Sequence, residues 1–159
     1  MIKTVVIRHP REKLSKCSLT PLHDRAEIQF FTATPDYVFD ATGFLLLEVG
    51  APPLTPEENH LPLLLLDATW RLLPHVKSKV VGTPVPRSIP EGVQTAYPRV
   101  GKYYPDPLGG LASIEALFIA RALLGDYDPS LLDAYHWREE FLESLPPWPL
   151  LQPDQNSKG

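Results

Sequence analysis

An apolar run that ends abruptly in polar residues is the strongest constraint on the fold. Four leucines at positions 63–66 lead directly into Asp67, which is followed by Ala68, Thr69, Trp70 and Arg71. An unbroken apolar run of this length is typical of a strand buried on both faces of a parallel sheet. Ligands bind at the carboxyl edge of such sheets, where we expect Asp67 to lie and Trp70 to offer an aromatic wall. Two hypotheses stay open from this pattern alone: Asp67 serves a binding site, or it caps the next helix.

The other apolar segments alternate between strand and helix patterns, which predicts the α/β class. The clearest helix covers residues 113–124, because its apolar side chains recur at helical spacing and Gly125 follows as a C-terminal cap. A long loop rich in Pro, Gly and Tyr reaches Gly109-Gly110, and loops of this length in compact domains are usually functional. We expect strands at residues 2–8, 28–32, 44–49, 63–67, 80–81 and 93–96, short helices after Thr55 and Trp70, and longer helices at 113–124 and about 129–145.

Length and composition exclude several classes of protein. The 159 residues indicate one domain, which we place at residues 1–145 with a tail at 146–159. No apolar run approaches the ~18 residues of a membrane helix, and the N-terminus does not fit a signal peptide. The single cysteine, Cys17, excludes an internal disulfide and fits a reducing cytoplasm. Neither a Walker A pattern nor GxGxxG occurs, and the five histidines show no ligand spacing, so we expect no metal.

Charge is distributed unevenly along the chain. The net charge is −4, yet the first 102 residues carry 12 basic and 10 acidic side chains, whereas the rest carry 3 and 9. Any RNA-binding surface is therefore expected in the first two thirds of the chain. The basic cluster Arg8, Arg11, Lys13 and Lys16, together with Arg71, supplies candidate phosphate contacts, although a solvated loop carries such charges equally well.

Two other titratable side chains have plain structural interpretations. Cys17 with His9 or His23 would form a nucleophile–base pair, but a small buried thiol is far commoner. Glu115 falls in the first turn of the predicted helix, where a carboxylate complements the helix dipole without any further function.

Several short motifs together resemble one known group of proteins. Asp67-Ala68-Thr69-Trp70 resembles the D-x-T/S-W signature of the DTW-domain proteins and of their relatives that modify small-subunit ribosomal RNA. Arg8–Glu12, followed by Ser18 and Thr20, resembles the H-P-R-E…T element of DTW domains. The ribosomal-RNA branch contains three further motifs, which are R-x-x-P, A-N-P and L-S-x-x-E-A-L. In this chain they are matched, in the same order, by Arg87–Pro90, Ala96–Pro98 and Leu111–Leu117. The shared order of these motifs over residues 5–125 makes the resemblance more specific than any one of them.

The resemblance implies a SPOUT-like fold, with a mostly parallel sheet flanked by helices and a C-terminal trefoil knot. It also implies an enzyme that moves the 3-amino-3-carboxypropyl group of S-adenosylmethionine to a nitrogen of uridine or a pseudouridine in tRNA or rRNA. The by-product would be 5′-methylthioadenosine. We expect a cytoplasmic protein, monomeric or weakly dimeric, with RNA as its partner. Two alternatives stay open: a SPOUT-type RNA methyltransferase that uses the same cofactor, and a non-catalytic RNA- or ribosome-associated protein.

The same resemblance implies roles for individual residues. Asp67 would orient or accept the imide proton of the attacking base. Trp70 would stack near the cofactor or attract its sulfonium cation. The cofactor-binding residues implied by the matching positions are Thr20, Val49, Gly50, Trp70, Ala96, Tyr97, Leu111 and Ser113.

The chain departs from the family pattern at three points. It lacks the cysteine cluster that binds zinc in many DTW proteins, so no metal is carried over. Tyr97 stands where A-N-P has asparagine, and Ala68 stands where glycine or cysteine is common.

Overall fold

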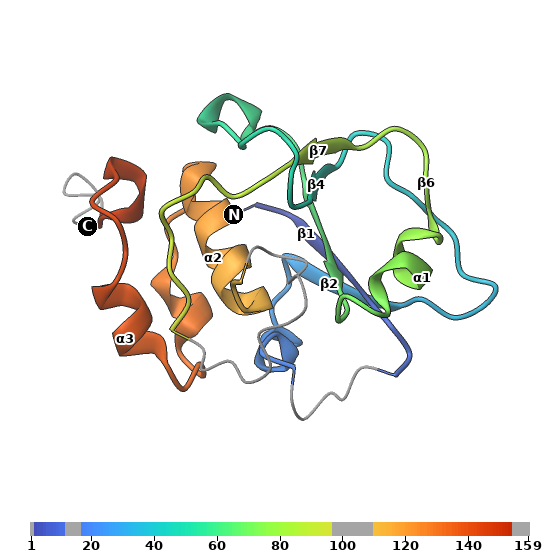
Figure 1. Ribbon diagram of the computed structural model, residues 1–159, viewed down its shortest axis with the longest axis horizontal. Helices are drawn as coiled ribbons and strands as arrows, with labels where there is room; N and C mark the ends of the chain where they lie inside the picture. The colour runs from blue at the N-terminus through green and yellow to red at the C-terminus, as the bar shows by residue number, and fades with distance from the viewer. Residues whose placement is uncertain (1, 12–16, 97–109, 154–159) are drawn as a thin grey trace.

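A five-stranded, all-parallel sheet forms the centre of the protein, which confirms the predicted α/β class (Figure 1). The computed structural model describes residues 2–11, 17–96 and 110–153. The strand order is β2-β1-β5-β4-β7, so the leucine run supplies the central strand. The main elements are β1 (Thr4–Arg8), β2 (Ile28–Thr32), β4 (Leu45–Leu47), β5 (Leu63–Asp67), β7 (Val85–Arg87), α1 (Leu73–Lys77), α2 (Ser113–Leu123) and α3 (Arg138–Glu143).

Helices cover both faces of this sheet, which explains why β5 is apolar until its last residue. Leu63 and Leu65 belong to the core cluster that contains α2, whereas Leu64 and Leu66 belong to the cluster that contains Val76 of α1. The two helices lie on opposite sides of the sheet (Figure 1). All four leucine side chains are buried. Because side chains alternate along a strand, the next residue, Asp67, projects toward α2. The central strand thus carries its carboxylate to the start of that helix.

Short elements connect the strands. A two-stranded parallel sheet pairs β3 (Phe39–Asp40), which we did not predict, with the predicted strand β6 (Val80–Val81). The helix expected after Thr55 is a single 3₁₀ turn, in which the Thr55 amide donates to Glu58 Oε1 at 2.9 Å. The 3₁₀ helices are η2 (Thr20–Leu22), η3 (Pro56–Glu58), η4 (Pro129–Leu132) and η5 (Pro149–Leu151).

The strand predicted at residues 93–96 is wrong, and β7 lies instead inside the segment predicted as loop. Pro86 in the middle of β7 hid this strand, because proline cannot donate to a ladder. The strand is tolerated because it is an edge of the sheet. The Val85 amide donates to the Phe44 carbonyl, and the Glu48 amide donates to the Arg87 carbonyl. The backbone nitrogen of Pro86, between these two residues, therefore lies on the side of β7 away from β4, where the ladder needs no donor.

The continuous helix predicted at about 129–145 is also wrong, because the segment is divided into η4 and α3. Asp128 caps the start of η4, because its carboxylate accepts a hydrogen bond from the Ser130 amide at 3.1 Å. The interruption at residues 133–137 allows the Tyr135 hydroxyl to donate to Glu115 at 3.0 Å. Phe141 of α3 is then fully buried in the core beside α2.

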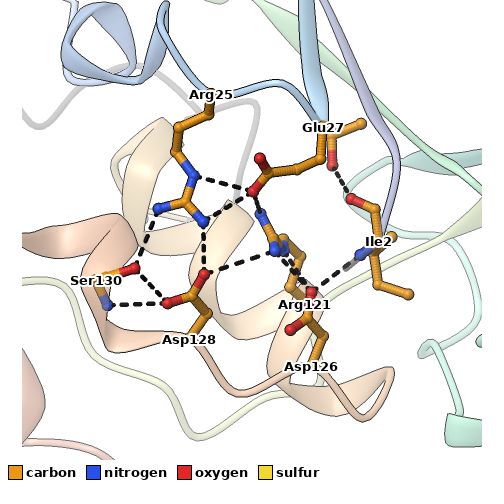
Figure 2. Close-up of polar contacts among 8 residues, drawn as sticks. Ile2, Arg25, Glu27, Arg121, Asp126, Asp128 and Ser130 are labelled. Carbon is orange, nitrogen blue, oxygen red and sulfur yellow. Dashed lines mark hydrogen bonds and ion pairs between the residues drawn. The ribbon is translucent and has the colours of Figure 1, made fainter.

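A network of charged side chains ties the end of α2 to the amino edge of the sheet (Figure 2). Arg121 is completely buried and lies 2.9 Å from Glu27 and 2.7 Å from Asp126. Arg25 lies 2.8 Å from Glu27 and 2.6 Å from Asp128. Asp126 also accepts the Ile2 amide at 3.0 Å. The network therefore links residues that precede β1 and β2 to the segment that follows α2.

The C-terminal segment packs on the main core. Leu151 of η5 is 1% exposed within the cluster that contains α2, and Trp148 and Leu150 pack against it. The division into a domain at 1–145 and a tail at 146–159 stays a prediction. Within residues 2–11, 17–96 and 110–153, no helix is both long and apolar enough to span a membrane.

Candidate functional site

Asp67 lies at the carboxyl edge of the sheet and is enclosed by three polar side chains. Its Oδ2 lies 3.3 Å from Arg8 Nε and accepts a hydrogen bond from the Cys17 thiol at 2.8 Å. Its Oδ1 accepts a hydrogen bond from the Ser113 hydroxyl at 3.0 Å. Asp67 is only 4% exposed. The acid therefore joins β5 to the neighbouring strand, to the segment after β1 and to the first residue of α2.

Arg8 belongs to this cluster and not to the protein surface. It is the register partner of Asp67 on β1, and it is 4% exposed. Its Nη2 donates to Cys17 Sγ and to Thr20 Oγ1, each at 3.3 Å, and its Nη1 lies 3.1 Å from His23 Nε2. These contacts occupy the guanidinium. The expectation that Arg8 meets RNA phosphates is corrected accordingly, because the parallel register places Arg8 beside a buried acid.

The Cys17 thiol is a hydrogen-bond donor in this cluster. Burial, with a further contribution from the charge and hydrogen bond of Asp67, raises the pKa of Cys17 to about 11. The thiol is therefore protonated at neutral pH, which does not fit a nucleophile. His23 contacts Arg8 instead of the thiol, and His9 Nδ1 accepts the Arg11 amide at 2.9 Å. The structure thus supports the buried-thiol interpretation of Cys17.

We expect the thiol of the native protein to react slowly with iodoacetamide at pH 8. Raising the pKa from 9.0 to about 11 lowers the thiolate fraction about 100-fold, and only the thiolate attacks. Mass spectrometry of timed samples measures the rate, and the same chain in urea serves as the control because its thiol is released. Equal alkylation rates in native and unfolded protein would contradict the assigned environment.

A pocket of about 630 Å³ opens at the same carboxyl edge of the sheet. Its walls come from the segments after β4 and β7 and from the start of α2. Val49, Gly50 and Leu111, three of the predicted cofactor-binding residues, line this pocket. Gly50 has a φ of +87°, a conformation that glycine adopts without strain, so the chain turns here along the pocket wall. Two acids, Glu48 and Glu91, belong to this otherwise largely apolar lining, and Glu48 is paired with Lys77 of α1.

Glu115 is a functional candidate that sequence reasoning missed. The residue is completely buried, and its carboxylate accepts hydrogen bonds from Thr95, Ala96, Ala112 and Tyr135. An acid within the apolar stretch at residues 114–120 was the available signal, because both sides of that helix are buried. The expected contact with the helix dipole describes only part of its environment.

The remaining predicted site residues lie apart from the pocket lining. Thr20 and Ser113 belong to the Asp67 cluster, and the Ala96 amide binds Glu115. Trp70 is 37% exposed, and the Arg71 guanidinium lies 5.4 Å from its ring centre. Arg11 and Arg71 are exposed. Three predicted residues lie outside the part of the chain that the structure describes: Lys13, Lys16 and Tyr97. In the described part of the chain, no group of three or more His, Cys, Asp or Glu side chains is arranged to hold a metal ion.

Comparison with known proteins found one informative structural likeness. The chain is similar to the SAM-dependent rRNA:acp-transferase Tsr3 from Vulcanisaeta distributa, with a TM-score of 0.66 and 25% sequence identity. The aligned region covers 90% of this chain and 78% of the Vulcanisaeta chain. Neither a protein-family model nor a curated protein matches the chain.

Proposed function

We propose that this protein is a transferase that uses S-adenosylmethionine to modify rRNA with an aminocarboxypropyl group. The observation that carries the proposal is the likeness to the Vulcanisaeta SAM-dependent rRNA:acp-transferase, which extends over 90% of this chain.

The pocket fits S-adenosylmethionine in size and in chemical character. Its volume of about 630 Å³ falls within the ~300–1,000 Å³ that is usual for cofactor sites. Val49, Val93 and Leu111 offer apolar surface for a purine ring. Glu91 offers negative charge to a cofactor that carries a sulfonium and an ammonium group, whereas the charge of Glu48 is paired with Lys77. We therefore assign this pocket to the cofactor.

Asp67 is our proposed catalytic residue. S-adenosylmethionine supplies a carbon activated by the adjacent sulfonium, so the protein must mainly position the base and manage its proton. Among the described residues, Ser113 is the only hydrogen-bond donor to Asp67 Oδ1. A hydroxyl rotates easily, so an imide N–H of a bound base can take its place at Oδ1. Arg8 and Cys17 meanwhile hold Oδ2 in a fixed position.

The finer features of the proposal come from the sequence resemblance. They are membership of the DTW-like group, a SPOUT-type fold with a trefoil knot, a uridine or pseudouridine nitrogen as acceptor, and release of 5′-methylthioadenosine. A tRNA acceptor, a cytoplasmic location and a monomeric or weakly dimeric state are proposals of the same kind. We also propose that exposed Arg11 and Arg71 contact RNA phosphates and that Trp70 lies near the cofactor.

Two differently labelled forms of the cofactor test the proposed reaction. The protein is incubated with small-subunit rRNA, and separately with tRNA, in the presence of carboxyl-labelled or methyl-labelled S-adenosylmethionine. Label retained in rRNA only from the carboxyl form supports aminocarboxypropyl transfer. Label retained from the methyl form would instead establish a methyltransferase. No transfer to either RNA, despite cofactor binding, would overturn the proposed reaction.

The assignment of the pocket predicts that Val49→Trp weakens cofactor binding at least ~10-fold, a loss of about 1.4 kcal/mol. Val49 lines the pocket and is 53% exposed, so the larger ring occupies the cavity without crowding the core. Calorimetric titration with S-adenosylmethionine measures the dissociation constant. Val38→Trp is the matched control, because Val38 is 63% exposed and lies outside the pocket lining. Unchanged affinity in the Val49 variant would remove the cofactor from this pocket.

A further inference from the structure

Glu115 receives a complete set of hydrogen bonds from neutral donors. Its Oε1 accepts the Thr95 hydroxyl at 2.6 Å and the Ala112 amide at 2.9 Å. Its Oε2 accepts the Ala96 amide at 2.9 Å and the Tyr135 hydroxyl at 3.0 Å. Each carboxylate oxygen thus binds one backbone N–H and one side-chain hydroxyl.

This environment explains how a carboxylate is accommodated at 0% exposure. Burial of a charge is costly unless hydrogen bonds replace the lost water. Among the described residues, no basic side chain pairs with Glu115, so the four donors and the N-terminal dipole of α2 provide the compensation. Loss of the carboxylate would leave two half-buried backbone amides, those of Ala96 and Ala112, without their acceptor.

The two amides belong to the two sides of the candidate cofactor pocket. Ala96 follows closely on Val93, and Ala112 directly follows Leu111, and both Val93 and Leu111 line the pocket. The next residue, Ser113, donates to Asp67. One buried carboxylate therefore connects the segment after β7, the start of α2 and, through Ser113, the proposed catalytic acid.

We propose that Glu115 is a positioning residue that holds the Val93 and Leu111 walls of the cofactor pocket at their working separation. This inference rests on the proposed function for its cofactor, whereas the clamp itself is a property of the fold. Glu115 lies beneath the pocket lining and acts through the backbone of its two walls. The Tyr135 hydroxyl extends the clamp to the segment between η4 and α3.

Glu115→Gln is the discriminating variant because it preserves the shape of the side chain and removes only half of its acceptor capacity. In either orientation of the glutamine, one oxygen is replaced by an NH₂ group that faces an amide and a hydroxyl donor. We expect the Ala96 or the Ala112 amide to exchange with deuterium at least about ten-fold faster than in the wild type. We also expect the KM for S-adenosylmethionine to rise at least about ten-fold, with a much smaller change in kcat at saturating cofactor.

Glu140→Gln is the matched control, because Glu140 is an exposed acid in the first turn of α3. It removes the same charge from a comparable helix position and should leave amide exchange at Ala96 and Ala112 and the KM unchanged. Tyr135→Phe removes one neutral donor while the carboxylate stays, so it should give a smaller increase in exchange. This milder variant keeps the clamp testable if the glutamine variant does not fold.

The two measurements separate the clamp from the proposed function. The clamp would be overturned if the amides of Ala96 and Ala112 exchanged in Glu115→Gln at the same rate as in the wild type. It would also be overturned if their exchange rates rose only as much as in Glu140→Gln. Faster exchange with an unaltered KM would show that the clamp does not position the pocket, which also overturns the proposal. If the wild type neither binds nor uses S-adenosylmethionine, the proposed function fails, whereas the exchange data still decide whether Glu115 joins the two walls.

Discussion

Replacing Asp67 with alanine is expected to abolish group transfer and to destabilise the fold. The first effect follows from the proposed role of Oδ1, since the base loses its proton partner at the carboxyl edge of the sheet. The second follows from Arg8, which stays buried after losing Asp67, its only acidic partner among the described residues. Breaking a buried ion pair on one side costs about 3–5 kcal/mol. Transfer assays with labelled cofactor and denaturant unfolding measure the two effects.

A second pair of variants separates chemistry from stability. Asp67→Asn retains the shape of the side chain and the Ser113 contact, so it should fold better than the alanine variant and still transfer at least ~100-fold more slowly. The double variant Arg8→Met with Asp67→Leu replaces the pair by apolar groups of similar size, which is often close to neutral for stability. We expect a folded but inactive protein. Full turnover by the asparagine variant would exclude Asp67 from the chemistry.

Arg121→Met should be the most destabilising substitution outside the site. Its guanidinium is fully buried, and its removal leaves Glu27 and Asp126 with fewer charged donors at the amino edge of the sheet (Figure 2). We expect a loss of about 3–5 kcal/mol from a total stability of about 5–15 kcal/mol. Urea unfolding followed by circular dichroism measures this loss, and activity should fall only in proportion to the unfolded fraction.

Arg138→Met is the matched control for this prediction. The Arg138 side chain is 31% exposed, and its acidic neighbours Asp133 and Glu139 are far more exposed than those of Arg121. Solvent-exposed ion pairs contribute roughly 0–1 kcal/mol, so the same loss of charge should have a small effect. Equal destabilisation by the two substitutions would indicate that the network around Arg121 contributes little to stability.

Local patterns predicted the elements that depend on neighbouring residues. The leucine run identified β5, and the helical spacing with Gly125 identified α2 to within one residue of its end. Asp67 was placed at the carboxyl edge by the same reasoning. In these cases the burial of a strand on both faces, or of a helix on one stripe, determines the spacing of apolar residues in the sequence.

Features that depend on contacts between distant segments were missed. Nothing near Arg8 in the sequence shows that the parallel register sets it beside Asp67, 59 residues later. Glu115 could be expected in a first helical turn, but its donors Thr95 and Tyr135 lie 20 residues away on either side. Pro86 argued against a strand at this position. A proline is compatible with an edge strand, but the position of β7 at the edge of the sheet follows only from the full topology.

The arginine network also constrains the order in which the chain can complete its structure. Glu27 meets Arg121 across 94 residues, and the Ile2 amide meets Asp126 across 124 residues. The starts of β1 and β2 therefore cannot gain Arg121 and Asp126 as partners until the end of α2 and the residues after it have been synthesised. Contacts of such long sequence separation slow folding, because loop-closure entropy is lost before the contacts compensate it. We expect apolar packing within the leucine-rich sheet to stabilise the emerging chain first. Full stability should be reached only after residues 121–128 have left the ribosome.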